Sequence, residues 1–332
     1  MFNKLYVKIK KFIKDNFTFL LSLFIIYITL TFPLPYYIYS GGGILEINDR
    51  IKIDGINNKQ DINLSYVSQL KGNVATFLLS YVIPHWDLEH VSDEEYDYEE
   101  ELYRSKILLE ESINNSTINA YKKANKEVNI IGEKVLVTYI LDEADTDIEV
   151  GDQIIKVNDN IIHNIDEFQN IISENEIGTE LKIEIMSKEK KKIRTAMVID
   201  IDGERKVGIG ILTNYVIDTN PNIEINFKGN EAGPSGGLML TVAIYDKLTN
   251  SKISENKKIC GTGTIDIDGN VGEIGGVKYK LRGAVDNKCD IFIAPSSNFE
   301  EVKKEKKKND YKIEIYEAKT FDDTIEYLIN NK

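Results

Sequence analysis

Residues 230–243, which read NEAGPSGGLMLTVA, decide the fold of the C-terminal third of the chain. Proline suits the first turn of a helix, so Pro234 predicts a helix that begins near Ser235. The neighbouring glycines, Gly233 and Gly236, leave room for another backbone to approach. A hydroxyl at a helix start lies where backbone N–H groups and the helix dipole favour negative charge. The stretch therefore fits either a nucleophilic serine or a capping serine in a glycine-rich turn.

A second stretch, residues 260–278, reads CGTGTIDIDGNVGEIGGVK and supports the first alternative. It predicts a strand, a turn at Asp268-Gly269 and then a helix that begins near Lys278. A nucleophilic serine needs a base, and no histidine follows His163 in the chain. A lysine can act as the base when it is neutral, and a position near a helix N-terminus disfavours its ammonium form. We therefore expect Lys278 to be the general base of Ser235, the alternative being a solvated lysine.

Together these two stretches resemble the proteolytic domain of the Lon protease family. The likeness is carried by GPSGG at 233–237, TGTI followed by a glycine and a valine at 262–271, and GGVK with a second lysine at 275–280. It covers about residues 207–332, and we place the domain at 206–332. The resemblance implies that Ser235 attacks the peptide bond and that Lys278 is the base. It also implies supporting roles for Thr262, Gly233 and Gly236, whereas Ala232 stands where many Lon proteins have an acid.

Residues 134–200 have the strand and helix order of a different module. They predict a strand at Val135–Leu141, a helix at about Asp166–Ser173 and two later strands, and residues 151–158 read GDQIIKVN. This pattern resembles a PDZ domain, in which an extended peptide adds as a strand beside a helix. The resemblance places peptide-binding residues on that first strand and that helix: Val135, Val137, Phe168 and Ile172. The alternative is a module that packs on its neighbour and binds no peptide.

The N-terminus has the pattern of a membrane anchor. Residues 1–16 carry five lysines against a single acid, and an apolar run from Phe17 to Leu34 follows. A run of roughly 18–20 apolar residues can span a bilayer as a helix, and tyrosines such as those at 36–39 favour its interface. We expect residues 1–16 to be a cytoplasmic basic tail, 17–39 to be a single-pass anchor in the cell membrane and the catalytic domain to lie outside. A cleaved signal peptide is the alternative.

Residues 40–133 lie between the expected anchor and the PDZ-like module. They contain short β-like runs, among them Val74–Val82, then an acidic run at 92–101 and a helical stretch to about Lys126. We expect an extracytoplasmic segment whose helical part packs on the PDZ-like module.

Composition narrows the class of protein. The chain has 332 residues, 42% of them apolar and 29% charged, which is typical of a globular protein. Its net charge of −13 argues against nucleic acid as a partner, and no glycine-rich phosphate loop occurs. We expect no metal and no cofactor. The only cysteines, Cys260 and Cys289, are expected to be buried and unpaired.

The predicted architecture is a multidomain α+β and α/β chain with a transmembrane helix, a PDZ-like module and a Lon-type proteolytic domain. This order resembles the membrane-bound, PDZ-containing Lon-like proteases of Gram-positive bacteria. It implies an ATP-independent serine endopeptidase that cleaves exposed peptides or flexible and unfolded segments of secreted or membrane proteins. Its partners would be those substrates, the membrane and further copies of the chain. Two alternatives stay open: a peptide-binding scaffold with an inert protease domain, and a protease that processes only itself.

Overall fold

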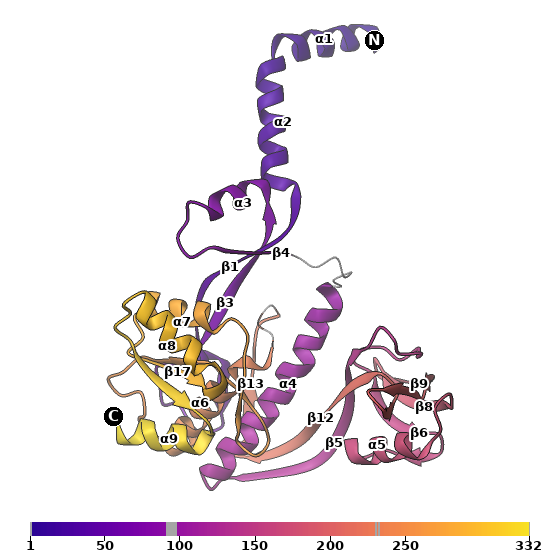
Figure 1. Ribbon diagram of the computed structural model, residues 1–332. Coiled ribbons are helices and arrows are strands. Elements are labelled where there is room, and N and C mark those ends of the chain that lie inside the picture. The colour runs from indigo at the N-terminus through magenta and orange to yellow at the C-terminus, as the bar shows by residue number, and fades with distance from the viewer. Residues whose placement is uncertain (1, 91–97, 230, 232, 332) are drawn as a thin grey trace.

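A mixed six-stranded sheet forms the centre of the domain that carries Ser235 (Figure 1). The computed structural model describes residues 2–90, 98–229, 231 and 233–331. The strand order is β18 (Glu314–Ala318), β17 (Ile291–Pro295), β14 (Ile259–Gly261), β3 (Ile62–Asn73), β1 (Pro33–Glu46) and β4 (Asp87–His90). Strand β14 is parallel to both of its neighbours, whereas β1 is antiparallel to both of its own. The central sheet therefore consists of three strands from the N-terminal part of the chain (β1, β3 and β4) and three from the C-terminal part (β14, β17 and β18).

Helices cover both faces of this sheet. On one face lie α4 (Tyr98–Lys123), α6 (Gly237–Thr249) and α9 (Phe321–Asn330), and on the other lie α7 (Val277–Asp286) and α8 (Phe299–Lys308). Both faces of β17 carry apolar side chains, because successive residues of a strand point to opposite faces of the sheet. Ile291 and Ile293 join the core beneath α6, whereas Phe292 and Ala294 join the core beneath α7. The domain is thus a three-layered α/β/α sandwich.

The expectation that residues 40–133 form a separate segment was wrong. Strands β1 and β3 belong to the central sheet. Helix α4 packs on α6, and Ser116 Oγ of α4 donates a hydrogen bond to the Gly237 carbonyl of α6 at 2.9 Å. The run Val74–Val82, expected to be β-like, begins as helix α3 (Val74–Ser80), because Asn73 and Thr76 form a capping box at its start. Most of the acidic run at 92–101 lies outside the described residues.

The PDZ-like module is an insertion between α4 and the loop that leads to Ser235. Its sheet has the order β12 (Ile209–Asn220), β5 (Glu127–Ile140), β6 (Gln153–Val157), β8 (Glu180–Ser187) and β9 (Lys190–Met197), with β7 (Asn160–Ile161) beside β6. Helix α5 (Ile165–Glu174) and the hairpin of β10 (Ile199–Ile201) and β11 (Glu204–Lys206) complete it. Because β12 is part of this sheet, the expected boundary at residue 200 was too early.

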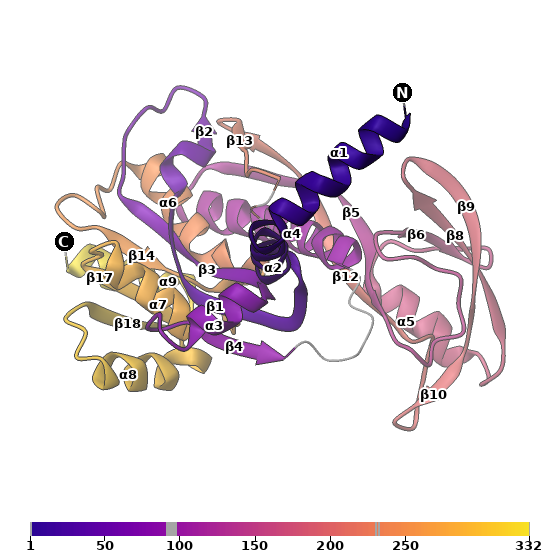
Figure 2. The ribbon, with the colours of Figure 1, turned by 90° about the horizontal axis from the view of Figure 1, so that it is seen from above.

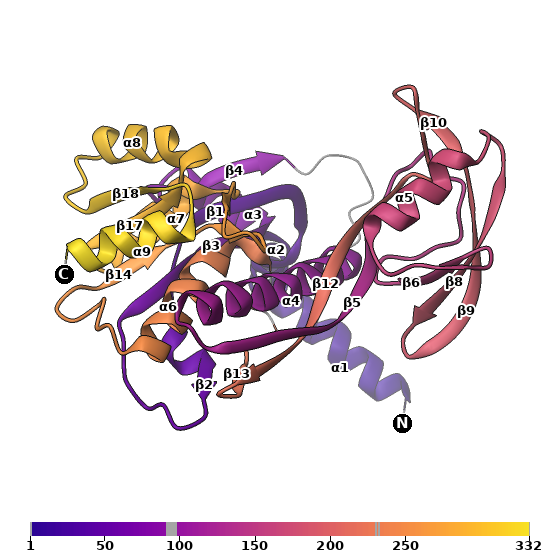
Figure 3. The same ribbon diagram turned by 90° about the horizontal axis from the view of Figure 1, so that it is seen from below.

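Strands β5 and β12 are longer than the module needs. They pair from Ile209 and Ile140 at one end to Asn220 and Glu127 at the other, and the second half of this ribbon runs beside α4 (Figure 3). Seen from above, the module lies to one side of the central sheet (Figure 2). The chain therefore enters and leaves the module through a single antiparallel ribbon.

Helices α1 (Phe2–Asp15) and α2 (Phe17–Thr31) form the N-terminus, and α2 stands away from the rest of the molecule with no buried residue (Figure 1). Within the described residues, no single helix has the length and apolar character to cross a membrane, although Leu5–Asp15 and Phe17–Thr31 qualify together as a pair bent by 77°. The expected span at 17–39 was wrong in its last third, because the helix ends at Thr31 and β1 begins at Pro33.

The two cysteines form a disulfide bond, which corrects the expectation of unpaired thiols. Cys260 lies on β14, and Cys289 lies two residues before the neighbouring strand β17. This adjacency brings their Cα atoms to 5.9 Å, a separation that a disulfide can bridge.

Candidate active site

Ser235 lies in a short 3-10 turn, Pro234–Gly236, that leads directly into α6. The turn is entered through Gly233 at a φ of 96°, a conformation that disfavours side chains with a Cβ. The Ser235 carbonyl accepts hydrogen bonds from the Gly263 N–H at 2.7 Å and from the Thr262 hydroxyl at 2.9 Å. These bonds fix the serine backbone against the segment that follows β14, so its hydroxyl has a defined position at the helix start.

Helix α4 holds the same turn from its other side. Ser112 Oγ donates a hydrogen bond to the Pro234 carbonyl at 3.2 Å. A Cβ at Gly237 would lie 2.6 Å from that hydroxyl oxygen, so the close approach of α4 and α6 requires a glycine here. This support could not be predicted from the sequence, because Ser112 is more than a hundred residues away from the serine turn.

An ion pair anchors the loop before Ser235. Arg50 donates to both carboxylate oxygens of Glu231, with Nε at 2.9 Å and Nη2 at 2.6 Å. The hydrogen bond from Arg50 lowers the pKa of Glu231. Strand β2 (Ile51–Ile53), which follows Arg50, pairs with β13 (Ile223–Ile225), which precedes Glu231. Backbone hydrogen bonds therefore join the two segments that the ion pair connects. The loop is thus tied to the turn that follows β1.

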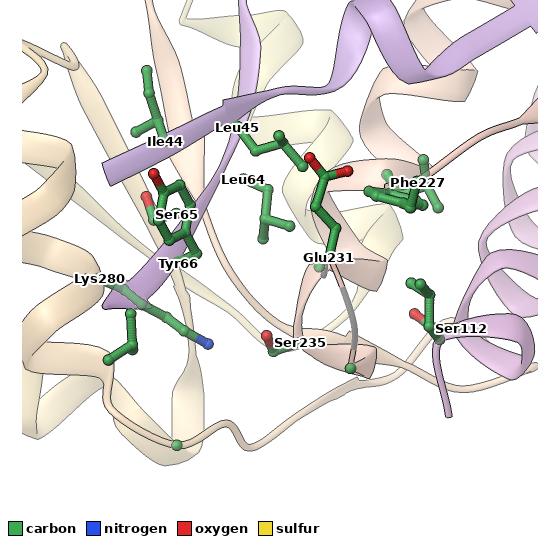
Figure 4. Close-up of a pocket in the computed structure, with 16 residues that line it drawn as sticks. Ile44, Leu45, Leu64, Ser65, Tyr66, Ser112, Phe227, Glu231, Ser235 and Lys280 are labelled. Atoms are coloured by element: carbon green, nitrogen blue, oxygen red, sulfur yellow. The ribbon is translucent and has the colours of Figure 1, made fainter. Parts of the chain in front are cut away.

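Lys280 is the lysine that shares a pocket with Ser235. The pocket has a volume of about 570 Å³, and Figure 4 shows the Lys280 amine pointing across it toward the Ser235 hydroxyl. The Lys280 side chain is buried, and its Nζ donates to Thr262 Oγ1 at 3.2 Å. Burial lowers the pKa of Lys280 to about 8, and no carboxylate in the described part of the chain pairs with its amine to oppose this. An amine in this state can lose its proton near neutral pH.

The structure contradicts Lys278 as the base of Ser235. Its Nζ forms an ion pair with Asp87 Oδ2 at 2.8 Å, and 35% of its side chain is exposed. Burial opposes its ammonium form, but hydrogen bonds with Asp87 and Tyr279 outweigh burial and raise the pKa of Lys278. A lysine held as a cation cannot accept a proton from a serine.

Helix geometry explains the error. Residues two apart on an α-helix point in directions about 200° apart, so Lys278 and Lys280 cannot face the same pocket. Val277, Leu281 and Ala284 define the buried face of α7, and Lys280 lies next to that face. The spacing of these apolar residues was a signal in the sequence that distinguished the two lysines.

The three residues expected to support catalysis all lie at the site. Thr262 is fully buried and connects the Lys280 amine to the Ser235 carbonyl. Gly233 and Gly236 line the pocket, and a Cβ at Gly236 would lie 2.7 Å from Leu64. The remaining wall is largely apolar, with these residues: Ile44, Leu45, Leu64, Val67, Leu109, Phe227 and Leu240.

A second hollow, of about 830 Å³, lies in the PDZ-like module between α5 and residues 207–211. Phe168 and Ile172 line it, as expected. Val135 and Val137 do not line it, although all four side chains belong to the core of the module. Their strand β5 lies between β12 and β6, so it has no free edge to which a peptide could add. Tyr139 and Leu141, at the end of the expected strand, do line the hollow, but the edge strand beside it is β12 and not β5.

The strand that borders this hollow is β12. It pairs only with β5, within the described residues, and its first residues read Ile-Gly-Ile at 209–211. Across the hollow, Arg205 Nη1 donates to the Ser173 carbonyl at 2.8 Å and so links the β10–β11 hairpin to the end of α5. The hollow has the form of a groove between a helix and an edge strand, which suits an extended peptide.

A serine and a buried lysine with a lowered pKa share one pocket of an α/β/α domain, and such a pair can supply a nucleophile and a base. Residues 228–331 match the family described as the Lon protease (S16) C-terminal proteolytic domain. The chain thus carries a Lon-type proteolytic domain.

Two curated relatives share this region. The Lon protease of Fusobacterium nucleatum is 39% identical over 94 residues, which is 27% of this chain and 12% of that protein. The Lon protease of Campylobacter jejuni is 27% identical over 155 residues, which is 43% of this chain and 19% of that protein. The chain thus matches less than a fifth of the length of either relative.

Among solved structures, the chain is similar to PDZ domains of SdrC-like proteins. One is from Listeria monocytogenes, with 23% identity over 26% of this chain and 93% of that one, at a TM-score of 0.23. Another is from Listeria innocua, with 21% identity over 24% of this chain and 92% of that one, at a TM-score of 0.22.

Proposed function

We propose that this chain is an ATP-independent serine endopeptidase in which Ser235 is the nucleophile and Lys280 is the general base. The observation that carries the proposal is the shared pocket, in which a buried amine with a pKa of about 8 points at a serine on a helix start. The match of residues 228–331 to the Lon proteolytic domain supports the same reaction class.

In the acylation step, neutral Lys280 accepts the proton of the Ser235 hydroxyl as the serine oxygen attacks the carbonyl carbon of the scissile peptide bond. The N-terminal end of α6 favours the negative charge that develops on the carbonyl oxygen. When the C–N bond breaks, the Lys280 ammonium gives its proton to the leaving amine. The products of this step are an ester on Ser235, a free amine and a neutral Lys280.

Deacylation repeats the proton transfers with water. Lys280 takes a proton from the water that attacks the ester, and it then returns that proton to the Ser235 oxygen as the ester bond breaks. The carboxylic product leaves and the enzyme returns to its starting state. A single residue serves as base and acid in both steps because its pKa lies close to the working pH.

The substrates we propose are extended segments of secreted or membrane proteins. A pocket of about 570 Å³ accommodates a few side chains and not a folded domain. Its largely apolar wall favours apolar side chains next to the scissile bond. The groove beside α5 and β12 is proposed to hold a second part of a longer substrate.

The proposed location is the outer side of a cell membrane. The lysines of α1 precede the apolar α2, an order that places the N-terminus in the cytoplasm. The Cys260–Cys289 disulfide supports an oxidising surrounding. Protease added to intact cells should then degrade the part of the chain after Tyr39. Protection of that part until the cells are lysed would overturn this location.

The test of the enzyme is hydrolysis of an unfolded protein by the purified full chain in detergent, compared with its Ser235→Ala variant. Hydrolysis by the wild type alone, unchanged by ATP or a metal chelator, is the expected result. Equal hydrolysis by Ser235→Ala would assign the activity to another residue or protein. Absence of hydrolysis of any added substrate would favour a scaffold or a self-processing protein.

A further inference from the structure

Helix α3 and the turn after it expose an unusual set of apolar side chains. Leu78, Leu79, Tyr81 and Val82 are all exposed, with Tyr81 at 74% and Val82 at 77%. We refer to these four residues as the α3 patch. The sequence has no charged residue between Lys71 and Asp87. Four exposed apolar side chains grouped on an uncharged segment are typical of an interaction surface and not of a solvated loop.

The α3 patch lies at the foot of α2. Asn73, which caps α3, also donates from Nδ2 to the carbonyl of Leu30 at 2.9 Å, in the last turn of α2. Figure 1 shows α3 lying across the base of α2, which rises from it away from the body of the molecule. The exposed apolar residues of α2 therefore end next to those of α3.

Helix α2 is shorter than the hydrocarbon core of a bilayer. With 15 residues and a rise of about 1.5 Å per residue, the helix is roughly 22 Å long. The hydrocarbon core of a bilayer is about 30 Å thick. A span shorter than the hydrocarbon core can be accommodated by local thinning of the bilayer, which brings the groups at its ends next to the lipid. At the outer end of α2 these groups are Phe32 and the α3 patch.

We propose that α3 and the turn after it form an interfacial element that lies in the outer headgroup region of the membrane, with the α3 patch in contact with lipid. The proposal rests on the membrane anchoring proposed above for α2. A helix that lies in the interface presents one apolar face to the acyl chains and places aromatic residues at the headgroups. Tyr81 of the α3 patch is such an aromatic residue.

Ring contacts and an ion pair link the α3 patch to the catalytic domain. Phe77 packs between Tyr36 and Tyr81, at ring distances of 5.3 and 5.5 Å. Asp87, the first charged residue after the patch, pairs with Lys278 on α7, the helix that also carries Lys280. An α3 held in the interface would therefore keep the active site at a fixed height and orientation above the membrane. Such a geometry favours cleavage sites close to the membrane surface.

The test uses the full chain in phosphatidylcholine and phosphatidylglycerol vesicles. Both native cysteines are in the disulfide, so Val82→Cys provides a free thiol for an environment-sensitive NBD dye. Ile193→Cys is the matched control, because it replaces a β-branched residue that is equally exposed, at 72%, on β9 of the PDZ-like module. The dye at position 82, and not at 193, should shift its emission to the blue and be quenched by brominated lipids. Trp86 provides a label-free second readout, since it is the only tryptophan.

The outcomes separate this proposal from the anchoring on which it rests. If the full chain does not float with vesicles, the anchoring itself fails. If the chain floats but the dye at position 82 behaves like the dye at 193, the anchor holds and the interfacial element is overturned. A blue shift at position 82 without quenching by brominated lipid would mean that a second copy covers the α3 patch, which also overturns the proposal.

Discussion

The Lys280 amine lies 3.2 Å from the hydroxyl oxygen of Thr262, and that same hydroxyl donates its only hydrogen to the Ser235 carbonyl. Thr262 can therefore only accept a hydrogen bond from Lys280. This arrangement uses an N–H of the amine and leaves its lone pair free. Thr262 thus orients the base and fixes the nucleophile's backbone at the same time, which no residue with a methyl in place of the hydroxyl could do.

The first prediction compares the two lysines of α7. Lys280→Met should reduce hydrolysis of a fluorogenic peptide by about 10²- to 10⁴-fold, the usual contribution of a general base. Lys278→Met should stay within about threefold of the wild type, because the surface pair that it removes contributes little. Steady-state rates at fixed pH, with circular dichroism to confirm folding, provide the comparison. A large loss for Lys278→Met together with an active Lys280→Met would restore Lys278 as the base.

The second prediction concerns pH. Only the neutral amine of Lys280 can accept the serine proton, so kcat/KM should rise with pH along a single ionisation and level off above about 8. At pH 7 about a tenth of the molecules would carry a neutral Lys280. A pH–rate series on a peptide of fixed charge measures this. A midpoint above 10, where free lysine titrates, would contradict a buried base.

The third prediction concerns stability. The pKa of Lys280 is about 8 in the folded chain and about 10.5 in the unfolded one, so below pH 8 the folded state carries a buried cation. This destabilises the fold by on the order of 3 kcal/mol, and the penalty disappears as pH rises from about 8 to 10.5. Lys280→Met should therefore be more stable than the wild type at pH 7. Urea denaturation of both proteins at pH 7 and pH 10 tests this. If Lys280→Met were more stable than the wild type by the same amount at both pH values, improved packing and not the buried charge would explain the difference.

The Ser235 turn was predictable from the sequence because its determinants are local. Proline at the helix start restricts the backbone, and the glycines on both sides permit conformations that other residues avoid, so a short window reveals the turn. The choice between Lys278 and Lys280 required one step more, namely the phase of the helix set by Val277, Leu281 and Ala284. The edge strand of the peptide groove was misassigned for a related reason: the sequence identified β5 as a strand but did not tell an interior strand from an edge.

Other features could not be predicted from one sequence. Strand β3 pairs with β14 across almost two hundred residues, and Arg50 reaches Glu231 over a similar separation. Neither pairing leaves a local pattern, because the contact is between surfaces that only the complete fold brings together. The N-terminal strands were therefore taken for a separate segment, although the central sheet is incomplete without them.

The fourth prediction tests the Arg50–Glu231 pair as a positioning device. Glu231→Gln keeps the shape of the side chain but removes its charge, and a hydrogen bond between charged groups contributes about 1.5–3 kcal/mol. We expect kcat to fall by roughly tenfold or more, with KM little changed, since the serine loop loses its anchor. Glu255→Gln is the matched control, because Glu255 pairs with Lys252 on the surface, with both side chains 59% exposed. Equal effects of the two substitutions on kcat would show that the Arg50 pair has no special role.

The last prediction concerns the inserted module, and the register of its ribbon determines how to remove it. Lys134 pairs with Asn214, and Val135 pairs with Thr213. Residues 135–213 can therefore be replaced by a short Asn-Gly turn, which closes an antiparallel ribbon. Asn214 stays in place, so its hydrogen bond with Asn114 of α4 is kept.

Cleavage of a short fluorogenic peptide by this deletion variant should persist, because Ser235, Lys280 and the elements that hold them are untouched. Cleavage of long unfolded substrates should fall, because the groove beside α5 is gone. Loss of both activities in a folded variant would assign the module a structural role, and retention of both would exclude it from substrate selection.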